Sequence, residues 1–367
     1  MIYILNFVAI LLLSTNSQAF PQLFLQNTER CIKCHSSEIG VGLLSQEGRL
    51  FSINNSAENK STDYQLPLPN WLRLGLKTQH RQYFYQSDYV KEATFKDLTT
   101  EILSEIKLND TLLIASIDRY TPNQANITFK DYVYISNLYA EYEIDTYFKI
   151  KFGKYFLNYG IDQFRQSQFK NSILFSKIQK GFEKNQAEIF YIQNNFDVAV
   201  AYIFNRTEFN QIYSEKGVLF NLKYIFDSQF LIGVASYTSE QSNVLAANES
   251  QKILGLFGIY KYDSDINFYF QVDQNINSSN KKGISAFIEP QITLKQGHMV
   301  LAKVEYLNYD IELSEPKFSE LVVGYRYTPW AQFNILAQIK KTNNSIDSIY
   351  LNNQNSESLA IDFNLTL

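Results

Sequence analysis

Both cysteines of the 367-residue chain, Cys31 and Cys34, lie three positions apart, and His35 follows directly. The pattern Cys-x-x-Cys-His is the attachment signature for c-type haem. Two thiols at this spacing on a short helical turn can reach the two vinyl groups of one porphyrin, and the next imidazole then binds the iron as its proximal ligand. The sequence therefore predicts one covalent haem c, held by Cys31, Cys34 and His35.

Two other interpretations of the cysteine pair stay open, a Cys31–Cys34 disulfide and a thiol redox pair. A thioredoxin-like pair would need a βαβ setting, which the surrounding sequence does not offer. A structural zinc site would need four ligands, whereas the whole chain holds two cysteines and three histidines. Haem attachment is the interpretation that accounts for all three residues.

The residues after the motif have the composition of a haem pocket. Gly40 and Gly42 would let the backbone approach a flat macrocycle closely, and Leu43 and Leu44 could cover one of its faces. Arg49 could pair with a haem propionate, although it could equally be a solvated surface charge.

This arrangement of Cys-x-x-Cys-His, a glycine-rich stretch, a leucine pair and Gly-Arg spans residues 30–51. It resembles the head of a family of bacterial outer-membrane proteins in which a single haem c module precedes a β-barrel. The resemblance implies a location in the outer membrane of a Gram-negative cell, with the haem module in the periplasm or in the barrel lumen.

The first residues predict export. A short apolar run ends at Ser17-Gln18-Ala19, a small-x-small cleavage pattern, so residues 1–19 are expected to be a signal peptide. Residues 1–6 carry no lysine or arginine, which departs from the usual pattern. The alternative is an uncleaved anchor, but roughly ten apolar residues are too few to span a bilayer.

Composition excludes several classes of function. The net charge is -4 and the isoelectric point about 5.6, so no nucleic acid is expected as a partner. Aromatic residues make up 15% of the chain, as expected where strands meet a membrane interface. No Ser/His/Asp set, catalytic carboxylate pair or phosphate loop is present, so we expect no enzyme.

From residue 69 to the end, apolar and polar residues alternate again and again. In DINFYFQVD, residues 265–273, Ile266, Phe268, Phe270 and Val272 share one face. Such a strand could belong to a sandwich, but the repetition behind a signal peptide favours an all-β fold, a transmembrane antiparallel up-and-down barrel with apolar side chains toward lipid. We expect about 16 strands, at residues 70–82, 96–108, 111–120, 130–143, 146–156, 182–193, 196–204, 217–226, 229–239, 252–262, 265–275, 283–294, 298–309, 317–328, 331–342 and 357–367.

The connections alternate between short turns, among them 109–110, 263–264, 295–297 and one around Pro329, and longer polar loops. An even strand number with short periplasmic turns places both ends of the barrel in the periplasm. The longest loop, 157–181, is read first as an ordinary surface loop. The alternative is a loop that folds into the lumen, as the corresponding loop of sixteen-stranded porins often does. GKYFLNYG, residues 153–160, resembles a strand end of phosphate-type porins.

Alternation also predicts the lumen charges, and their mixed sign indicates a lumen crossed by ion pairs. The expected inward residues are Arg73, Lys77, Arg81, Glu101, Glu105, Lys107, Lys149, Lys151, Lys303 and Glu305.

A distal iron ligand could come from His80, His298 or Met299, the remaining histidines and methionine of the processed chain. His80 is expected near the outer rim, whereas 298 and 299 lie on the side where residues 20–68 enter. Alternation turns Met299 toward the lumen and His298 toward lipid. A five-coordinate iron, or a ligand from a partner, is the alternative.

The predicted organisation is a signal peptide at 1–19, a haem c module and linker at 20–68, and an outer-membrane barrel at 69–367. Two functions fit it. One is electron transfer at or across the outer membrane with a periplasmic or surface cytochrome as partner. The other is a porin-like channel or structural barrel in which the haem aids folding or docking.

Overall fold

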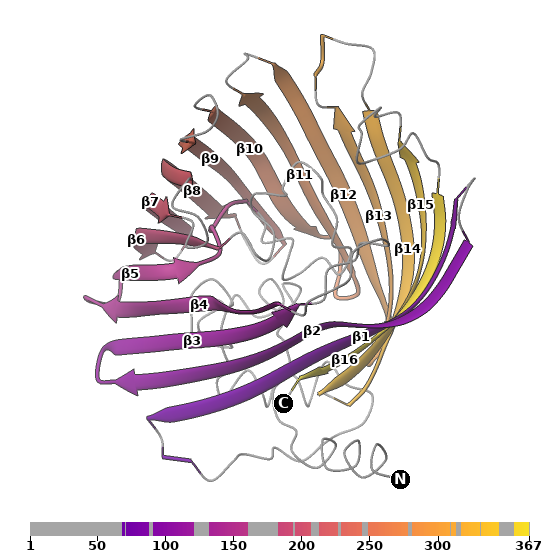
Figure 1. The fold of residues 1–367 in the computed structure, drawn as a ribbon, viewed down its shortest axis with the longest axis horizontal. Coiled ribbons are helices and arrows are strands. Elements are labelled where there is room, and N and C mark those ends of the chain that lie inside the picture. The colour runs from indigo at the N-terminus through magenta and orange to yellow at the C-terminus, as the bar shows by residue number, and fades with distance from the viewer. Residues whose placement is uncertain are drawn as a thin grey trace.

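A computed structural model describes residues 68–366, apart from the gaps 70, 88–90, 121–131, 161–182, 194, 207–212, 227–228, 244–248, 278–280, 309, 313–316, 331 and 345–355. The described residues form sixteen strands (Figure 1). Their bounds are β1 Leu72–Ser87, β2 Lys91–Leu108, β3 Thr111–Tyr120, β4 Tyr132–Glu143, β5 Phe148–Tyr155, β6 Lys184–Gln193, β7 Phe196–Arg206, β8 Tyr213–Ile225, β9 Phe230–Asn243, β10 Glu249–Lys261, β11 Ile266–Asn277, β12 Lys282–Lys295, β13 His298–Asn308, β14 Lys317–Trp330, β15 Phe333–Asn344 and β16 Ser356–Thr366.

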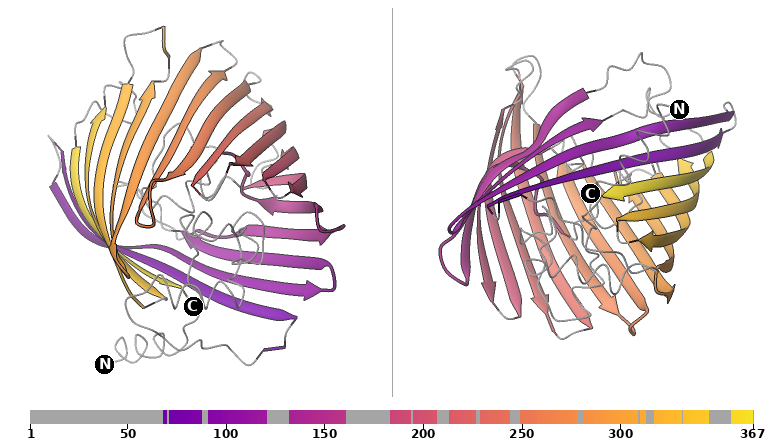
Figure 2. Two further views of the ribbon diagram at one scale, coloured as in Figure 1. Left: turned by 180° about the vertical axis from the view of Figure 1, so that it is seen from behind. Right: turned by 90° about the horizontal axis from the view of Figure 1, so that it is seen from below.

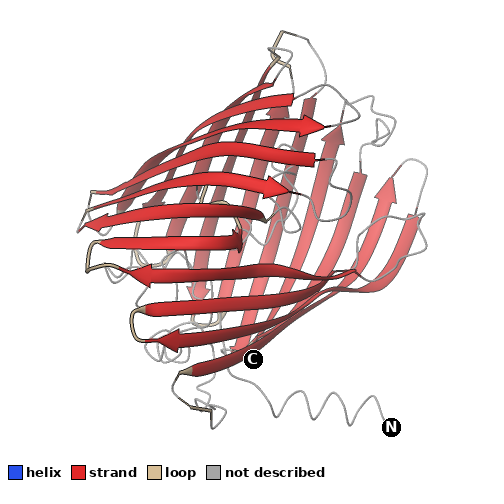
Figure 3. Ribbon diagram, turned by 60° about the vertical axis from the view of Figure 1, so that its left-hand side comes forward, coloured by secondary structure: helices blue, strands red, loops and turns tan. Residues whose placement is uncertain are grey.

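Every strand pairs antiparallel with its sequence neighbours, and β1 pairs with β16 to close the barrel. The closing register places Arg81 opposite Asp362 and His80 opposite Phe363. Figures 2 and 3 show the same continuous wall from other sides. The expected closed, sixteen-stranded up-and-down barrel is confirmed. Closure leaves no unpaired strand edge, which is what a β structure needs in lipid.

The pattern of side-chain burial along each strand is the reverse of the pattern in the sheet of a water-soluble protein. Outward side chains such as Phe152, Leu254 and Ile339 are apolar and exposed, with 63% of the Ile339 surface accessible. Inward side chains such as Lys151 and Asp362 are charged and buried. An apolar exterior around a polar interior is the pattern of a barrel that sits in a bilayer.

One end of the barrel carries tight turns, which include 109–110, 144–147, 262–265 and 296–297. Asp145 Oδ1 accepts hydrogen bonds from the amides of Tyr147 and Phe148 at 2.7 and 2.8 Å. Asp263 repeats this arrangement in the turn before β11. Such Asx turns satisfy backbone donors where the ladder stops. β1 begins and β16 ends at this short-turn end.

Several expected strand ends are wrong, among them those of the first hairpin and of β14. The first hairpin is longer than predicted, because β1 continues to Ser87 and β2 already starts at Lys91. Pro329 lies inside β14 and not in the following turn, at a point where the β14–β15 register shifts between Tyr327 and Trp330. A bulge of this kind accommodates a residue that cannot donate to the ladder. Among the described residues no helix is long and apolar enough to cross a membrane.

Candidate functional site

An aromatic band follows the short-turn end of the barrel on its outer face. Ring contacts there join neighbouring strands, with centroids 4.8 Å apart for Phe148 and Tyr191, and 6.2 Å apart for Phe230 and Tyr260. Further along the wall, the His298 ring stacks on Tyr327 at 4.8 Å. Aromatic rings gather where a barrel meets the membrane interface. The lumen inside this wall is therefore the candidate functional site.

Residues 156–160 enter the lumen directly after β5. Asn158 Nδ2 donates to Glu188 Oε1 of β6 at 3.3 Å, and the Asn158 carbonyl accepts from Asn221 of β8 at 2.8 Å. The Tyr159 hydroxyl then donates to Asp273 Oδ1 of β11 at 2.7 Å. Through these contacts the segment runs across the inner wall from β5 to β11. The segment therefore narrows the lumen. Residues 156–160 thus follow the inward alternative and not the surface loop that the sequence favoured, whereas 161–181 lie outside the described part of the chain.

Local sequence explains this path. Gly160 has a φ of +64°, a conformation that side chains with a Cβ rarely adopt, and a Cβ there would lie 2.5 Å from Gln271 Oε1. On β10, a Cβ on Gly255 would lie 2.5 Å from the Tyr159 hydroxyl. The two glycines therefore leave room for the segment to turn and for its tyrosine to reach Asp273.

Beneath the segment, the inner wall from β7 to β12 carries an apolar cluster. Leu157 and Tyr159 pack there in one buried cluster with Ala201, Ile203, Leu219, Leu231, Ala235, Tyr237, Ile253, Phe257, Ile259, Tyr269 and Phe287. A lumen that simply held water would not bury such a surface. Burial of apolar area contributes about 25 cal/mol per Å², so this cluster holds the segment more firmly than its hydrogen bonds alone could.

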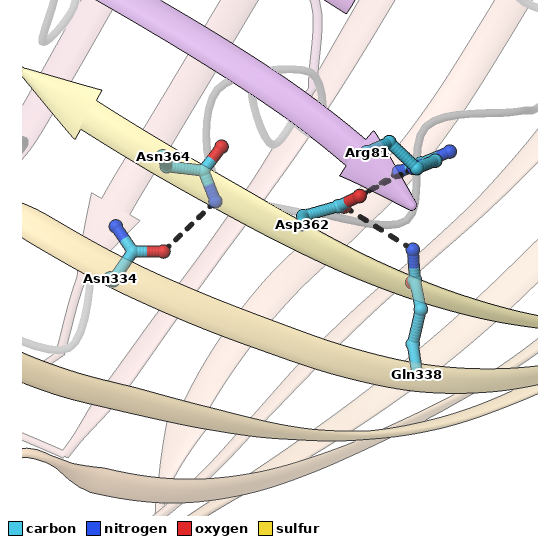
Figure 4. A network of polar contacts seen from close by, with 5 residues as sticks. All are labelled: Arg81, Asn334, Gln338, Asp362 and Asn364. Atoms are coloured by element: carbon cyan, nitrogen blue, oxygen red, sulfur yellow. Dashed lines mark hydrogen bonds and ion pairs between the residues drawn. The ribbon is translucent and has the colours of Figure 1, made fainter. Parts of the chain in front are cut away.

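On the opposite part of the wall, ion pairs line β1, β2, β14, β15 and β16. Arg73 pairs with Glu105 at 3.1 Å, and Lys340 pairs with Glu320. Arg81 binds Asp362 through Nε and Nη2 at 2.5 and 2.7 Å, and Asp362 also accepts from Gln338 (Figure 4). Each of these pairs joins adjacent strands.

The mixed sign of the lumen charges was thus expected, but the geometry of these three pairs was not. They lie along the wall between adjacent strands, because a side chain on one strand reaches the next strand more easily than the far side. The inward lysine of β5, Lys151, has another environment. Its Nζ lies 3.8 and 4.0 Å from the ring centroids of Tyr139 and Tyr155, which stabilises the buried charge by cation–π contact.

The predicted haem-binding residues Cys31, Cys34, His35, Gly40, Gly42, Leu43, Leu44 and Arg49 lie outside the described part of the chain. The three candidate distal ligands, in contrast, lie within the described part of the chain. His298 and Met299 point to opposite faces as alternation predicts: Nδ1 of His298 contacts the outward Tyr325 hydroxyl, and Met299 packs inside against Leu301, Val322 and Leu336. Arg326 Nη1 lies 3.9 Å from Met299 Sδ.

His80 is not near the outer rim. It lies in the middle of β1, opposite Phe363, on the face that β1 turns toward lipid. The structure therefore separates the three candidates, because only Met299 faces the lumen. Within the described residues, no group of three or more His, Cys, Asp or Glu side chains could hold a metal ion.

Sequence reasoning missed three residues that organise the lumen, namely Tyr159, Asp273 and Asp362. Asp273 and Asp362 alternate with apolar residues in their strands, so their inward direction was readable from the sequence. Their partners were not, since Tyr159 is 114 residues from Asp273 and Arg81 is 281 residues from Asp362.

No known protein family and no curated protein matches the sequence. Solved structures do match the fold. The outer-membrane protein OmpT of Vibrio cholerae has a TM-score of 0.61 at 11% identity, over 83% of this chain and 100% of that one. The outer-membrane channel DcaP of Acinetobacter baumannii has a TM-score of 0.61 at 9% identity, over 81% of this chain and 97% of that one. An anion-selective porin from Comamonas acidovorans has a TM-score of 0.59 at 8% identity, over 81% and 99%.

The class that the fold defines is the closed sixteen-stranded β-barrel of outer-membrane porins. At these identities the likeness is one of fold alone.

Proposed function

We propose that the chain is an outer-membrane diffusion channel for small hydrophilic solutes. The observation that carries this proposal is the closed barrel with an apolar exterior and a charged interior, crossed on the inside by residues 156–160. An apolar exterior fits lipid, and a polar lumen offers water a path through it. Two of the similar structures are an outer-membrane channel and a porin, which supports the same function.

The segment 156–160 acts as the size filter of this channel. It is anchored on β6, β8 and β11, so it keeps one position on that side of the lumen. The passage in this proposal follows the opposite wall of β1, β2, β15 and β16. Side chains of that wall keep part of their surface accessible, as Arg73 and Lys340 do.

Liposome swelling tests the channel. Vesicles that contain the purified protein should swell in isotonic solutions of small sugars, and the rate should fall as the sugar becomes larger. Vesicles without protein are the control. Folded protein that produces no swelling with any sugar would contradict the proposal.

We further propose that residues 20–68 carry one haem c, bound through thioethers at Cys31 and Cys34 with His35 as proximal ligand. The donor set fits, because two thiols at this spacing and the following imidazole are the groups that the attachment requires. From the described residues, Met299 is the one candidate distal ligand on the lumen side. When bound, the haem would supply one-electron redox chemistry.

Electron transfer is the second candidate function, and the Cys-x-x-Cys-His motif favours it. One haem cannot carry electrons across an apolar band about 25 Å tall by itself. Transfer across the membrane would therefore require a partner cytochrome, in the periplasm or at the surface.

The mass of the intact mature protein tests haem attachment. Protein made in cells with a working c-type maturation system should be heavier than its sequence by one haem, and the Cys31→Ala, Cys34→Ala variant should lack that mass. A haem-free wild-type chain would overturn this second proposal and leave the channel proposal untouched.

A further inference from the structure

Three ion pairs on the β1–β2 and β14–β16 wall share one asymmetry, in which the base is the more accessible member. The side-chain exposure is 30% for Arg73 against 1% for Glu105, 16% for Arg81 against 0% for Asp362, and 25% for Lys340 against 1% for Glu320. Each carboxylate is buried in the wall behind its base. Each pair is neutral in total, but its positive end is the accessible one.

The strand register places these bases at successive levels. Arg73 and Arg81 lie on β1. In the strand register, Lys340 of β15 lies opposite Ser358 of β16, and Ser358 lies opposite Tyr85 of β1. The three bases therefore lie at the levels of residues 73, 81 and 85. Lys77 is partly accessible on the same inward face between the two arginines. Four residues of strand span about 13 Å, so the bases follow the wall from the short-turn end upward.

We propose that the row of bases formed by Arg73, Arg81 and Lys340, here called the ladder of bases, makes the passage selective for anionic solutes. This inference rests on the proposed channel function. A solute in the lumen approaches the cationic end of each pair more closely than the buried anionic end, so the attraction of the base exceeds the repulsion of the acid. Screening acts over about 10 Å at 0.1 M salt, so the effect depends on passage close to this wall.

Two other pairs lack the asymmetry. Lys303 and Glu305, 2.7 Å apart, are both buried, at 1% and 4% exposure. Lys149 and Glu143 have the opposite arrangement at the short-turn end, where the acid is the exposed member. Because both members of the first pair are buried and the second pair lies at the mouth of the barrel, neither pair adds an accessible base to the ladder of bases.

The reversal potential of single channels in planar bilayers tests the inference. Under a gradient of potassium chloride, the wild-type protein should show a higher permeability for chloride than for potassium. The variant Arg81→Gln with Asp362→Asn removes both charges and keeps the net charge and a hydrogen-bonding pair. It should lower the ratio of chloride to potassium permeability about twofold, and a second double variant, Lys340→Gln with Glu320→Gln, should act in the same direction.

The matched control is Lys303→Gln with Glu305→Gln, which removes a buried pair from the neighbouring strand β13 without changing an accessible base. Its reversal potential should equal that of the wild type. A conducting wild type without preference for chloride would overturn the inference, as would ladder variants whose selectivity is unchanged. A protein that does not conduct at all would instead refute the channel itself.

Discussion

The hydroxyl of Tyr159 fixes the segment 156–160 to the far wall of the lumen. The change Tyr159→Phe removes the donor to Asp273 and leaves that buried carboxylate with the Gln271 amide as its close partner. Loss of such a bond costs about 1–3 kcal/mol. We expect a lower thermal unfolding midpoint in detergent and noisier single-channel currents, as the segment moves more.

The control is Tyr142→Phe, which changes an outward, half-exposed tyrosine on β4. It should leave both readouts close to wild type. Equal effects of the two substitutions would mean that the Tyr159 contact does not hold the segment.

The same contact predicts a pH dependence. Burial and the neighbouring Asp273 raise the pKa of Tyr159 well above its ordinary value, which is about 10. A raised pKa favours the neutral form in the folded state, so the contribution to stability is complete below about pH 10 and declines above it, because the unfolded chain then ionises. The difference in free energy of unfolding between wild type and Tyr159→Phe should therefore shrink above about pH 10. A difference that stays the same in alkaline solution would contradict this assignment.

Met299 is the candidate distal ligand that the barrel geometry supports, provided that the proposed haem enters the lumen. The change Met299→Ala should abolish the sulfur-to-iron charge-transfer absorption of the oxidised protein. His80→Ala and His298→Ala should leave the spectrum unchanged, because both imidazoles lie on the outer face. A changed spectrum in either histidine variant, with none in Met299→Ala, would place the haem elsewhere.

At the scale of the strand, alternation decides which substitutions the barrel tolerates. Leu256 lies at the middle of β10 and faces outward. An arginine on the lipid face near the midplane costs about 2–4 kcal/mol. Leu256→Arg should therefore reduce the amount of folded protein in the outer membrane, as measured by heat-modifiable migration in electrophoresis.

Gln296→Arg supplies the control, since residue 296 is exposed in the turn between β12 and β13. It should accumulate as wild type does. A barrel that accepts arginine equally at both positions would not be embedded in lipid as we describe.

Alternation also explains how much of the fold the sequence could predict. A period of two residues is visible without knowledge of the partner strand, so all sixteen strands and the inward direction of Arg73, Arg81 and Lys151 could be predicted. Strand ends were less certain, because Tyr83 and Tyr85 both face inward on β1 and interrupt the apolar and polar contrast there. A proline read as a turn signal was in fact a bulge in β14.

Contacts between distant strands could not be predicted in the same way. Closure brings Arg81 of the first strand to Asp362 of the last, and nothing local to either residue encodes that register. The crossing of Tyr159 to Asp273 depends on space left by Gly255, a residue that the alternation pattern does not single out.

At the scale of the whole molecule, the short-turn end should face the periplasm. The two ends of β13 allow a matched test, since residue 296 lies in the turn before it and Glu312 in the connection after it. A membrane-impermeant thiol reagent should label Glu312→Cys on intact cells, and should label Gln296→Cys only after the outer membrane is opened. The reverse labelling would invert the barrel.

The central claim is that this barrel conducts, and single-channel recording in planar bilayers tests it most directly. Purified, folded protein should insert in discrete steps of ohmic conductance, and the step size should change when Tyr159→Phe loosens the segment 156–160. Folded protein that inserts and yet leaves the bilayer without current would contradict the account.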